Sequence, residues 1–158
     1  MNKITFHKAN PEDAHMLAEY RIRFAIELAG GQTSERIEAL KKQMIEYFTR
    51  ATLENSCISF IAKSNNTIAG LGSVHVREVP GNFKNMSGKW GYIMNMYTVP
   101  EFRKQGICSE ILKLLVNEGK RHGITAFELH ATEEGKPVYL KGGFQIHNEP
   151  TLRKYFDA

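Results

Sequence analysis

The turn at residues 101–109 holds the densest set of groups that could bind an anion. It reads Glu-Phe-Arg-Lys-Gln-Gly-Ile-Cys-Ser. A segment rich in Tyr, Ile, Met and Val precedes it at residues 90–99, and Pro100 ends that segment. The segment that follows, residues 107–122, has apolar residues at helical spacing. The pattern predicts a strand, a tight turn and a helix that begins inside the turn.

The start of such a helix is a ready anion site. Its first amides have no acceptor within the helix, and the helix dipole adds positive potential at the same end. Gly106 allows the backbone to approach a phosphate, and Arg103 and Lys104 add charge beside it. We therefore predict that the amides of residues 105–109 bind a diphosphate. The turn matches neither a Walker loop nor a Gly-x-Gly-x-x-Gly turn. The alternative is that Gly106 only relieves a tight turn beside solvated basic residues.

A second motif stands further along the chain, where residues 139–144 read Tyr-Leu-Lys-Gly-Gly-Phe. In having both motifs, the chain resembles the GCN5-related N-acetyltransferases (GNAT family). That family has Arg or Gln, two residues, Gly, one residue, then Gly or Ala between a strand and a helix. Residues 103–108 match it, with Cys108 at the last position. The family's Tyr-x-x-x-Gly-Phe element matches residues 139–144, with a helix and a strand between the two motifs.

The resemblance implies that acetyl-CoA is the co-substrate and lies where two parallel strands, residues 90–99 and 124–132, splay apart. It implies that Arg103 shapes the loop and adds positive potential, while Thr132 stands where many members have a cofactor-contacting Asn. The predicted contacts are Tyr97, Thr98 and Val99 to pantetheine, through the backbone, and Arg103, Lys104, Gln105, Gly106, Ile107, Cys108, Ser109 and Thr132 to the rest of the cofactor.

The resemblance also implies a catalytic residue, because Tyr139 occupies the family's acid position near the thioester sulfur. Acyl transfer to an amine requires a proton for the departing thiolate. A phenol has a pKa of about 10 and a thiol a pKa of about 8.5, so proton transfer from the phenol to a thiolate is uphill by roughly 2 kcal/mol. Tyr139 is the predicted acid; the alternative is a packing role on a short helix.

Neither motif identifies the general base. Glu128, His130 and Thr132 alternate on one strand face, so they are candidates if that face lines the gap. Glu78, Glu133 and a relayed water are further candidates. For each of these side chains, solvated surface is the alternative.

Cys108 departs from the family pattern, since it is larger than Gly or Ala. Two interpretations stay open. A thiol at a helix N-terminus can be acidified and reactive, whereas a Cys can also pack as a small apolar residue. We favour packing.

The element pattern predicts one domain over residues 1–158 with an α+β fold in three α/β/α layers. The expected sheet is mixed, mostly antiparallel and of about six or seven strands, with about four helices, as in the GNAT-like acyl-CoA N-acyltransferase fold. The strands are expected at 4–8, 57–62, 68–76, 90–99 and 124–131, with a final pair after 141; the helices are expected at 11–29, 33–48, 107–122 and 137–141.

Composition narrows the function classes further. The 158 residues carry a formal net charge of +4, two cysteines and no apolar run long enough to span a membrane. A disulfide framework is excluded, the six histidines lack metal-ligand spacing, and the start is not expected to be a signal peptide. We therefore expect a cytoplasmic protein without a metal. Scattered basic residues disfavour nucleic acid, and no membrane partner is expected.

The acceptor is predicted only by class. An amine of a small molecule or of a peptide or protein fits the chemistry, and a homodimer is compatible with the fold. The leading interpretation is an acetyl-CoA-dependent N-acetyltransferase that acts by direct attack in a ternary complex. The alternative is a non-catalytic acyl-CoA-binding or sensor protein of the same fold.

Overall fold

The computed structural model describes residues 2–156 of the 158-residue chain. The strands are β1 (Ile4–Lys8), β2 (Cys57–Ser64), β3 (Thr67–Glu78), β4 (Lys89–Thr98) and β5 (Ala126–Glu128). The helices are α1 (Ala14–Ala29), α2 (Ser34–Leu53), α3 (Ile107–Arg121) and α4 (Lys136–Lys141), with 3-10 turns at Pro11–Asp13 and Pro100–Phe102.

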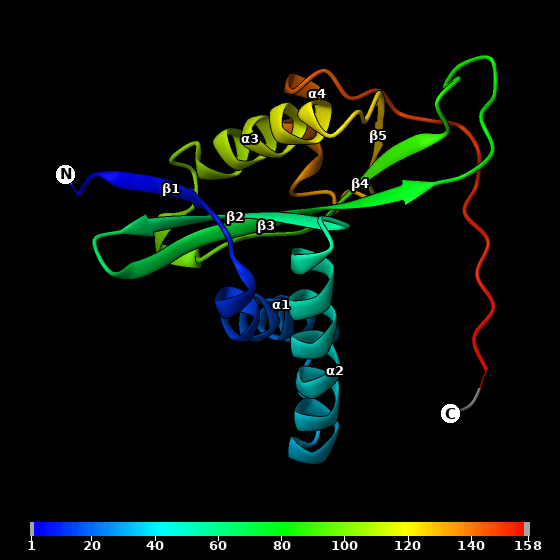
Figure 1. Cartoon of the computed structure of the whole chain (residues 1–158). Helices are drawn as coiled ribbons and strands as arrows, with labels where there is room; N and C mark the ends of the chain where they lie inside the picture. Colours follow the sequence, from blue (N-terminus) through cyan, green and yellow to red (C-terminus); the bar gives the residue numbers. More distant parts are fainter. Residues whose placement is uncertain (1, 157–158) are drawn as a thin grey trace.

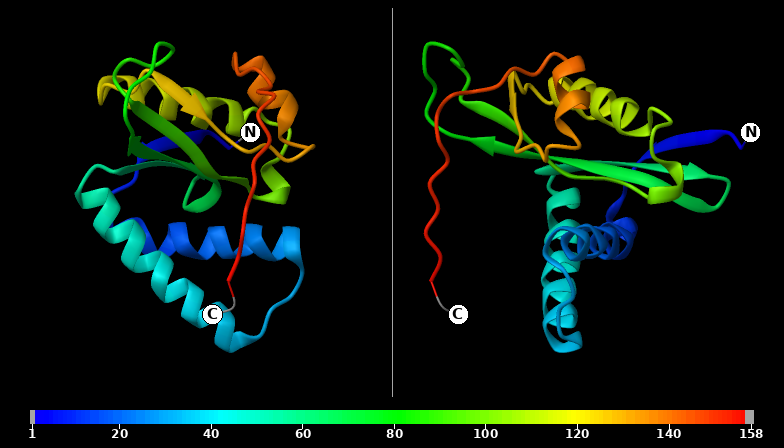
Figure 2. Two further views of the ribbon diagram at one scale, coloured as in Figure 1. Left: turned by 90° about the vertical axis from the view of Figure 1, so that its right-hand side faces the viewer. Right: turned by 180° about the vertical axis from the view of Figure 1, so that it is seen from behind.

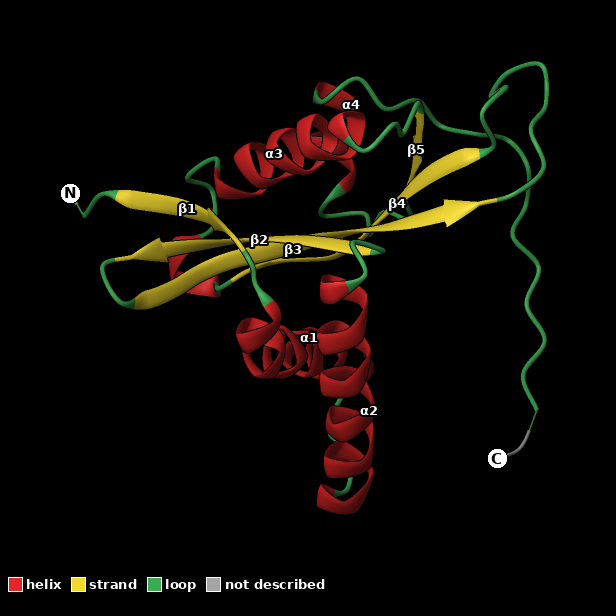
Figure 3. Ribbon diagram, in the orientation of Figure 1, coloured by secondary structure: helices red, strands yellow, loops and turns green. Residues whose placement is uncertain are grey.

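The strands form one sheet in the order β1-β2-β3-β4-β5, antiparallel except for the parallel pair β4 and β5. Helices α1 and α2 lie against one face of the sheet, and α3 and α4 lie against the other (Figure 1; Figure 3). The predicted mixed α+β plan is confirmed. Within residues 2–156, no helix is both long enough and apolar enough to cross a bilayer.

Local chemistry explains where the first helical segment begins. The Asn10 side chain accepts a hydrogen bond from the Glu12 amide at 2.9 Å, and the Asp13 carboxylate accepts one from the Asn10 amide at 2.9 Å. This reciprocal pair satisfies amides that the helix itself leaves free. The predicted start of this helix is therefore confirmed. At its other end, Gly30, at φ 82°, follows the last residue of α1.

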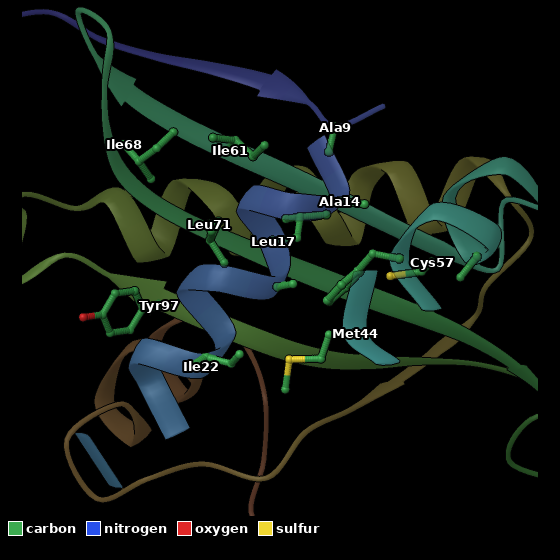
Figure 4. Packing of buried hydrophobic residues seen from close by; sticks show 13 residues of the cluster. Ala9, Ala14, Leu17, Ile22, Met44, Cys57, Ile61, Ile68, Leu71 and Tyr97 are labelled. Carbon is green, nitrogen blue, oxygen red and sulfur yellow. The ribbon is translucent and has the colours of Figure 1, made fainter. Parts of the chain in front are cut away.

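Two apolar cores hold the layers together. Between the sheet and the α1/α2 layer, Leu17, Phe48 and Leu71 are buried; Figure 4 shows Leu17 and Leu71 among the side chains packed there. Between the sheet and the α3/α4 layer, Ile111 and Leu115 of α3 are fully buried against the strands. The first core holds α2 against the sheet, and the second fixes the direction of α3.

The substitution Phe48→Ala tests the first core. Phe48 is 1% exposed, so its removal leaves a cavity and should lower the free energy of unfolding by about 3–5 kcal/mol. Leu53→Ala, in the same helix but 67% exposed, is the control and should change it by less than about 0.5 kcal/mol. Urea unfolding measures both; equal losses would contradict this description of the core.

The prediction of a final strand pair after α4 is wrong. Residues 142–156 contain no strand, so the described sheet has five strands rather than six or seven. β5 is also shorter than expected, at Ala126–Glu128 instead of 124–131. Sequence pattern marks residues that can form a strand, but a strand exists only where a neighbour bonds to its backbone. Here the last segment leaves the body of the molecule instead (Figure 2).

Candidate functional site

The parallel pairing of β4 with β5 is brief. It runs only from Trp90–Ala126 to Tyr92–Glu128, although β4 continues to Thr98. Residues 93–98 of β4 therefore have no strand partner on the β5 side within the part of the chain that the structure describes. In the same stretch, Asn95 (φ 58°) and Met96 stand opposite the single residue Gly72 of β3. This bulge bends β4 where its outer edge becomes free.

Backbone alternation shows which amides face this free edge. The Val99 amide donates to the Ala69 carbonyl of β3 at 2.9 Å. Successive strand residues direct their backbone groups to opposite edges, so Tyr97 also faces β3 while Thr98 and Met96 face outward. Of the three residues predicted to bind pantetheine, only Thr98 thus presents its amide to the open edge. Met96, which was not among the predicted contacts, shares this orientation.

The turn that follows is shaped by two left-handed residues, Lys104 (φ 63°) and Gly106 (φ 78°). The first helical bond of α3 runs from the Glu110 amide to the Gly106 carbonyl at 3.1 Å. Within residues 2–156, the amides of residues 105–109 have no acceptor, and no side chain caps the helix. A Cβ placed on Gly106 would meet no atom within 4 Å. Free amides at a helix start, facing open space, fit an anion such as a diphosphate.

The buried side chain of Ile107, 2% exposed, anchors this helix start. A Cβ on Gly70 of β3 would lie 3.0 Å from an Ile107 methyl carbon, so β3 approaches α3 closely at this point. Ile107 can therefore offer only its amide to a ligand. Gln105, Gly106 and Ser109 are exposed beside it.

Arg103 joins the turn to α1 rather than pointing into free solvent. Its Nε donates to the Thr98 carbonyl at 2.9 Å, and its guanidinium pairs with Glu27 of α1 at 2.9 Å. The Tyr97 hydroxyl donates to the same Glu27 carboxylate. Arg103 is thus placed to hold the loop, and Lys104 remains exposed beside it.

These contacts shift the ionisation of both partners. The hydrogen bond from Tyr97, with a further contribution from Arg103, holds the pKa of Glu27 below its ordinary value. Burial, and then the hydrogen bond to Glu27, raises the pKa of Tyr97 to about 12. Glu27 is therefore ionised and Tyr97 is protonated at neutral pH. Sequence reasoning missed Glu27, because no local pattern connects α1 with the end of β4.

Glu27→Gln tests this connection. Because the pKa of Glu27 is lowered on folding, its carboxylate stabilises the fold above the ordinary carboxyl pKa of about 4.3, and the effect is lost as the pH falls through the lowered pKa. Glu27 is partly exposed, so we expect a loss of only about 1 kcal/mol at pH 7. This corresponds to a fall in Tm of roughly 2–4 °C. Thermal melts at neutral and strongly acidic pH check it.

Glu19→Gln is the matched control, since the one partner of Glu19 among residues 2–156 is exposed Arg23 on the same helix. Its effect at pH 7 should stay within about 0.5 kcal/mol. A Tm difference for Glu27→Gln that does not shrink on acidification would contradict the assigned ion pair.

Tyr139 lies in α4 and is 9% exposed in the core between the sheet and α3. Its ring packs edge-on against Phe144, with 6.3 Å between ring centroids. Burial, with a smaller contribution from Cys108, raises the pKa of Tyr139. The hydroxyl therefore keeps its proton at neutral pH, as a proton donor must.

Burial also raises the pKa of the Cys108 thiol. Desolvation thus outweighs any acidification by the start of α3, and the thiol stays protonated at neutral pH. Of the two interpretations of Cys108, this ionisation favours packing over reactivity.

The candidates for the general base differ in their contacts. Glu128 is held by Arg77 at 2.7 Å, and the Thr132 hydroxyl accepts from the Gly135 amide at 3.1 Å. The His130 ring stands edge-on to Tyr92, with 5.8 Å between centroids. Glu128 and His130 therefore lie on either side of the point where β4 and β5 stop pairing. Thr132 lies beyond β5, in the turn that precedes α4 (Lys136–Lys141).

Comparisons with known proteins identify the family to which this fold belongs. The family model for the acetyltransferase (GNAT) family matches residues 20–144. The chain belongs to this family. A predicted acetyltransferase from Clostridium acetobutylicum, solved with acetyl-CoA, is 33% identical to this GNAT chain, and the match covers 96% of each chain with a TM-score of 0.86.

More distant acetyltransferase structures share the fold. A GCN5-related N-acetyltransferase from Ralstonia eutropha is 21% identical, with 96% of this chain and 99% of that chain covered and a TM-score of 0.83. An aminoglycoside acetyltransferase from an uncultured soil sample, solved with sisomicin, is 12% identical, with 98% and 96% covered and a TM-score of 0.67. Among curated proteins, none matches the chain significantly.

Proposed function

We propose that this GNAT protein transfers the acetyl group of acetyl-CoA to an amine of an acceptor by direct attack in a ternary complex. The observation that carries the proposal is the row of free amides at residues 105–109, which faces open space at Gly106. The Clostridium relative, solved with acetyl-CoA, supports the same cofactor here. A diphosphate would sit on these amides.

The residues of this site divide the chemistry among them. Bound acetyl-CoA supplies a thioester whose carbonyl carbon accepts the amine nitrogen, with cleavage of the carbon–sulfur bond. The outward amides of Thr98 and Met96 would hold and orient the pantetheine part of the cofactor. Tyr139 donates its proton to the departing sulfur. His130, Glu128 or a water between them removes the proton that the amine loses.

Calorimetry with acetyl-CoA tests the binding half of the proposal. Release of free thiol in the presence of an amine panel tests the chemical half. The panel contains amino acids, amino sugars, polyamines, peptides with free N-termini and aminoglycosides, the last because one structural relative was solved with sisomicin. No heat from acetyl-CoA would overturn the proposal. Tight binding without thiol release from any amine would instead assign an acyl-CoA sensor of the same fold.

A further inference from the structure

Arg21 is a half-buried cation that lacks a partner. It lies on the inner side of α1, three residues after buried Ala18 and four after buried Leu17, so it points towards the layer between the helices and the sheet. Arg23, two residues further on, pairs with Glu19 at the surface. Among residues 2–156, Arg21 takes part in no ion pair and no side-chain hydrogen bond. A charge at this depth with five free donors calls for an acceptor.

The groups around Arg21 come from α2 and β3. Burial raises the pKa of the Tyr47 hydroxyl and of the Cys57 thiol, and the nearby charge of Arg21 opposes this rise at both. The Tyr47 hydroxyl shares a hydrogen bond of 3.1 Å with Nδ1 of His75 in β3. When the His75 ring donates this bond, the hydroxyl proton of Tyr47 is free for a ligand. A guanidinium beside a phenol offers charge-assisted hydrogen bonds to an anion.

His75 begins a row of side chains that crosses the sheet on the α1/α2 face. It stands opposite Tyr92 of β4, which in turn stands opposite Glu128 of β5. Residues directly opposite each other point to the same face, and these three are half-buried. Figure 1 shows β5 and the adjoining end of β4 extending beyond α1 and α2. The row therefore leads from Arg21 to the place where β4 and β5 stop pairing, over two strand spacings or about 10 Å.

The proposed cofactor site leaves this face open to the acceptor. Tyr139 and Met96 lie in the core on the α3/α4 side of the sheet, and the free amides of residues 105–109 begin α3. Acetyl-CoA held by these groups occupies the α3/α4 side of the free edge of β4. The amine must come within about 3–3.5 Å of the thioester carbon. The α1/α2 face, where the His130 ring packs on Tyr92, is the side left for its approach.

We propose that the acceptor is an amine that also carries an anionic group, a carboxylate or a phosphate, and that Arg21 binds this group while the amine reaches the thioester. This inference rests on the proposed acetyl transfer and adds the class of acceptor. The planar fork of a guanidinium matches both kinds of anion. The amine and the anion of a good acceptor should lie roughly 5–10 Å apart, one to two strand spacings. The net charge of +4 also favours an anionic ligand.

Acceptor pairs that differ in the anionic group test the proposed class. The pairs are glucosamine 6-phosphate with glucosamine and 6-aminohexanoate with hexylamine, and glycine is the short acceptor. Thiol release should give the anionic member of a pair a kcat/KM about 10-fold to 100-fold higher. Glycine should be acetylated more slowly than 6-aminohexanoate, and the better of the two anionic members shows which anion is preferred. Equal rates within both pairs would overturn the proposal.

Substitutions at Arg21 show whether this residue is the origin of the preference. Arg21→Gln should remove the preference and leave the affinity for acetyl-CoA within about threefold. Arg21→Lys keeps the charge but loses the planar fork, so it should retain part of the preference. Arg23→Gln is the matched control, because Arg23 is exposed on the same helix, and it should keep the preference in full. Equal losses in Arg21→Gln and Arg23→Gln would mean that net charge alone attracts the acceptor, which contradicts the assigned contact.

A second measurement needs neither acetyl-CoA nor turnover, so it stays readable if the proposed acetyl transfer fails. In NMR spectra of the arginine side chains, the Nε resonance of Arg21 is identified by its absence in Arg21→Gln. It should shift on titration with 6-aminohexanoate or inorganic phosphate, with and without coenzyme A, and should not shift with hexylamine. A resonance that neither anion moves overturns the proposal. Equal shifts for Arg21 and Arg23 would mean an adventitious ion only, and would overturn it as well.

Discussion

Replacing Tyr139 with Phe is expected to lower kcat for acetyl transfer by about 100-fold to 1,000-fold, the usual contribution of a positioned acid. The affinity for acetyl-CoA should change by less than about threefold, because the ring and its packing against Phe144 are retained. The initial rate of thiol release at saturating substrate measures kcat, and calorimetry measures the affinity for acetyl-CoA.

The raised pKa of Tyr139 adds a pH signature. Its hydroxyl stays protonated well above neutral pH, so kcat should show no decline from Tyr139 ionisation below about pH 10.

Tyr20→Phe is the control, since it removes a hydroxyl from a partly buried tyrosine of α1 that packs on Tyr97. It should leave kcat within about threefold of the parent value. Equal losses of kcat and acetyl-CoA affinity in Tyr139→Phe would assign Tyr139 a packing role. An unchanged kcat would remove it from the mechanism.

Gly106→Val should weaken acetyl-CoA binding by about 10-fold to 100-fold. Gly106 has a φ of 78°, which costs a residue with a Cβ about 1–2 kcal/mol. The new side chain would also project into the open space where the diphosphate is proposed to lie. Calorimetry with acetyl-CoA measures the loss, and thermal melts show how much of it reflects stability alone.

Gly30→Val is the control for this experiment. Gly30 also has a positive φ, 82°, and open space around it, but it ends α1 and lies outside the diphosphate site. Its ψ of −178° places it in a region that only glycine adopts readily, so the substitution should lower Tm by more than Gly106→Val does, while acetyl-CoA affinity stays within about threefold. If both substitutions lower Tm and neither weakens binding, the amides of residues 105–109 do not hold the cofactor.

Features that depend on near neighbours in the chain follow from the sequence alone. The cap at Asn10, the turn through Gly106 and the helix start at Ile107 each arise within a few residues, so residue type and spacing suffice to predict them. The two family motifs likewise identify the GNAT family, because each occupies one short stretch. The turn and the helix start that form the candidate diphosphate site were therefore predictable almost to the residue.

Which distant groups meet depends on how the elements pack in three dimensions. Glu27 reaches Tyr97 and Arg103 across 70 and 76 residues, and no periodicity encodes that contact. Alternation along β4 could be counted, but the edge that each amide faces depends on which strand lies beside it. The strand-like residues after α4 could be recognised too, yet pairing is a property of two segments and not of one. A sequence shows what each segment is able to do, and packing selects the partner with which it does so.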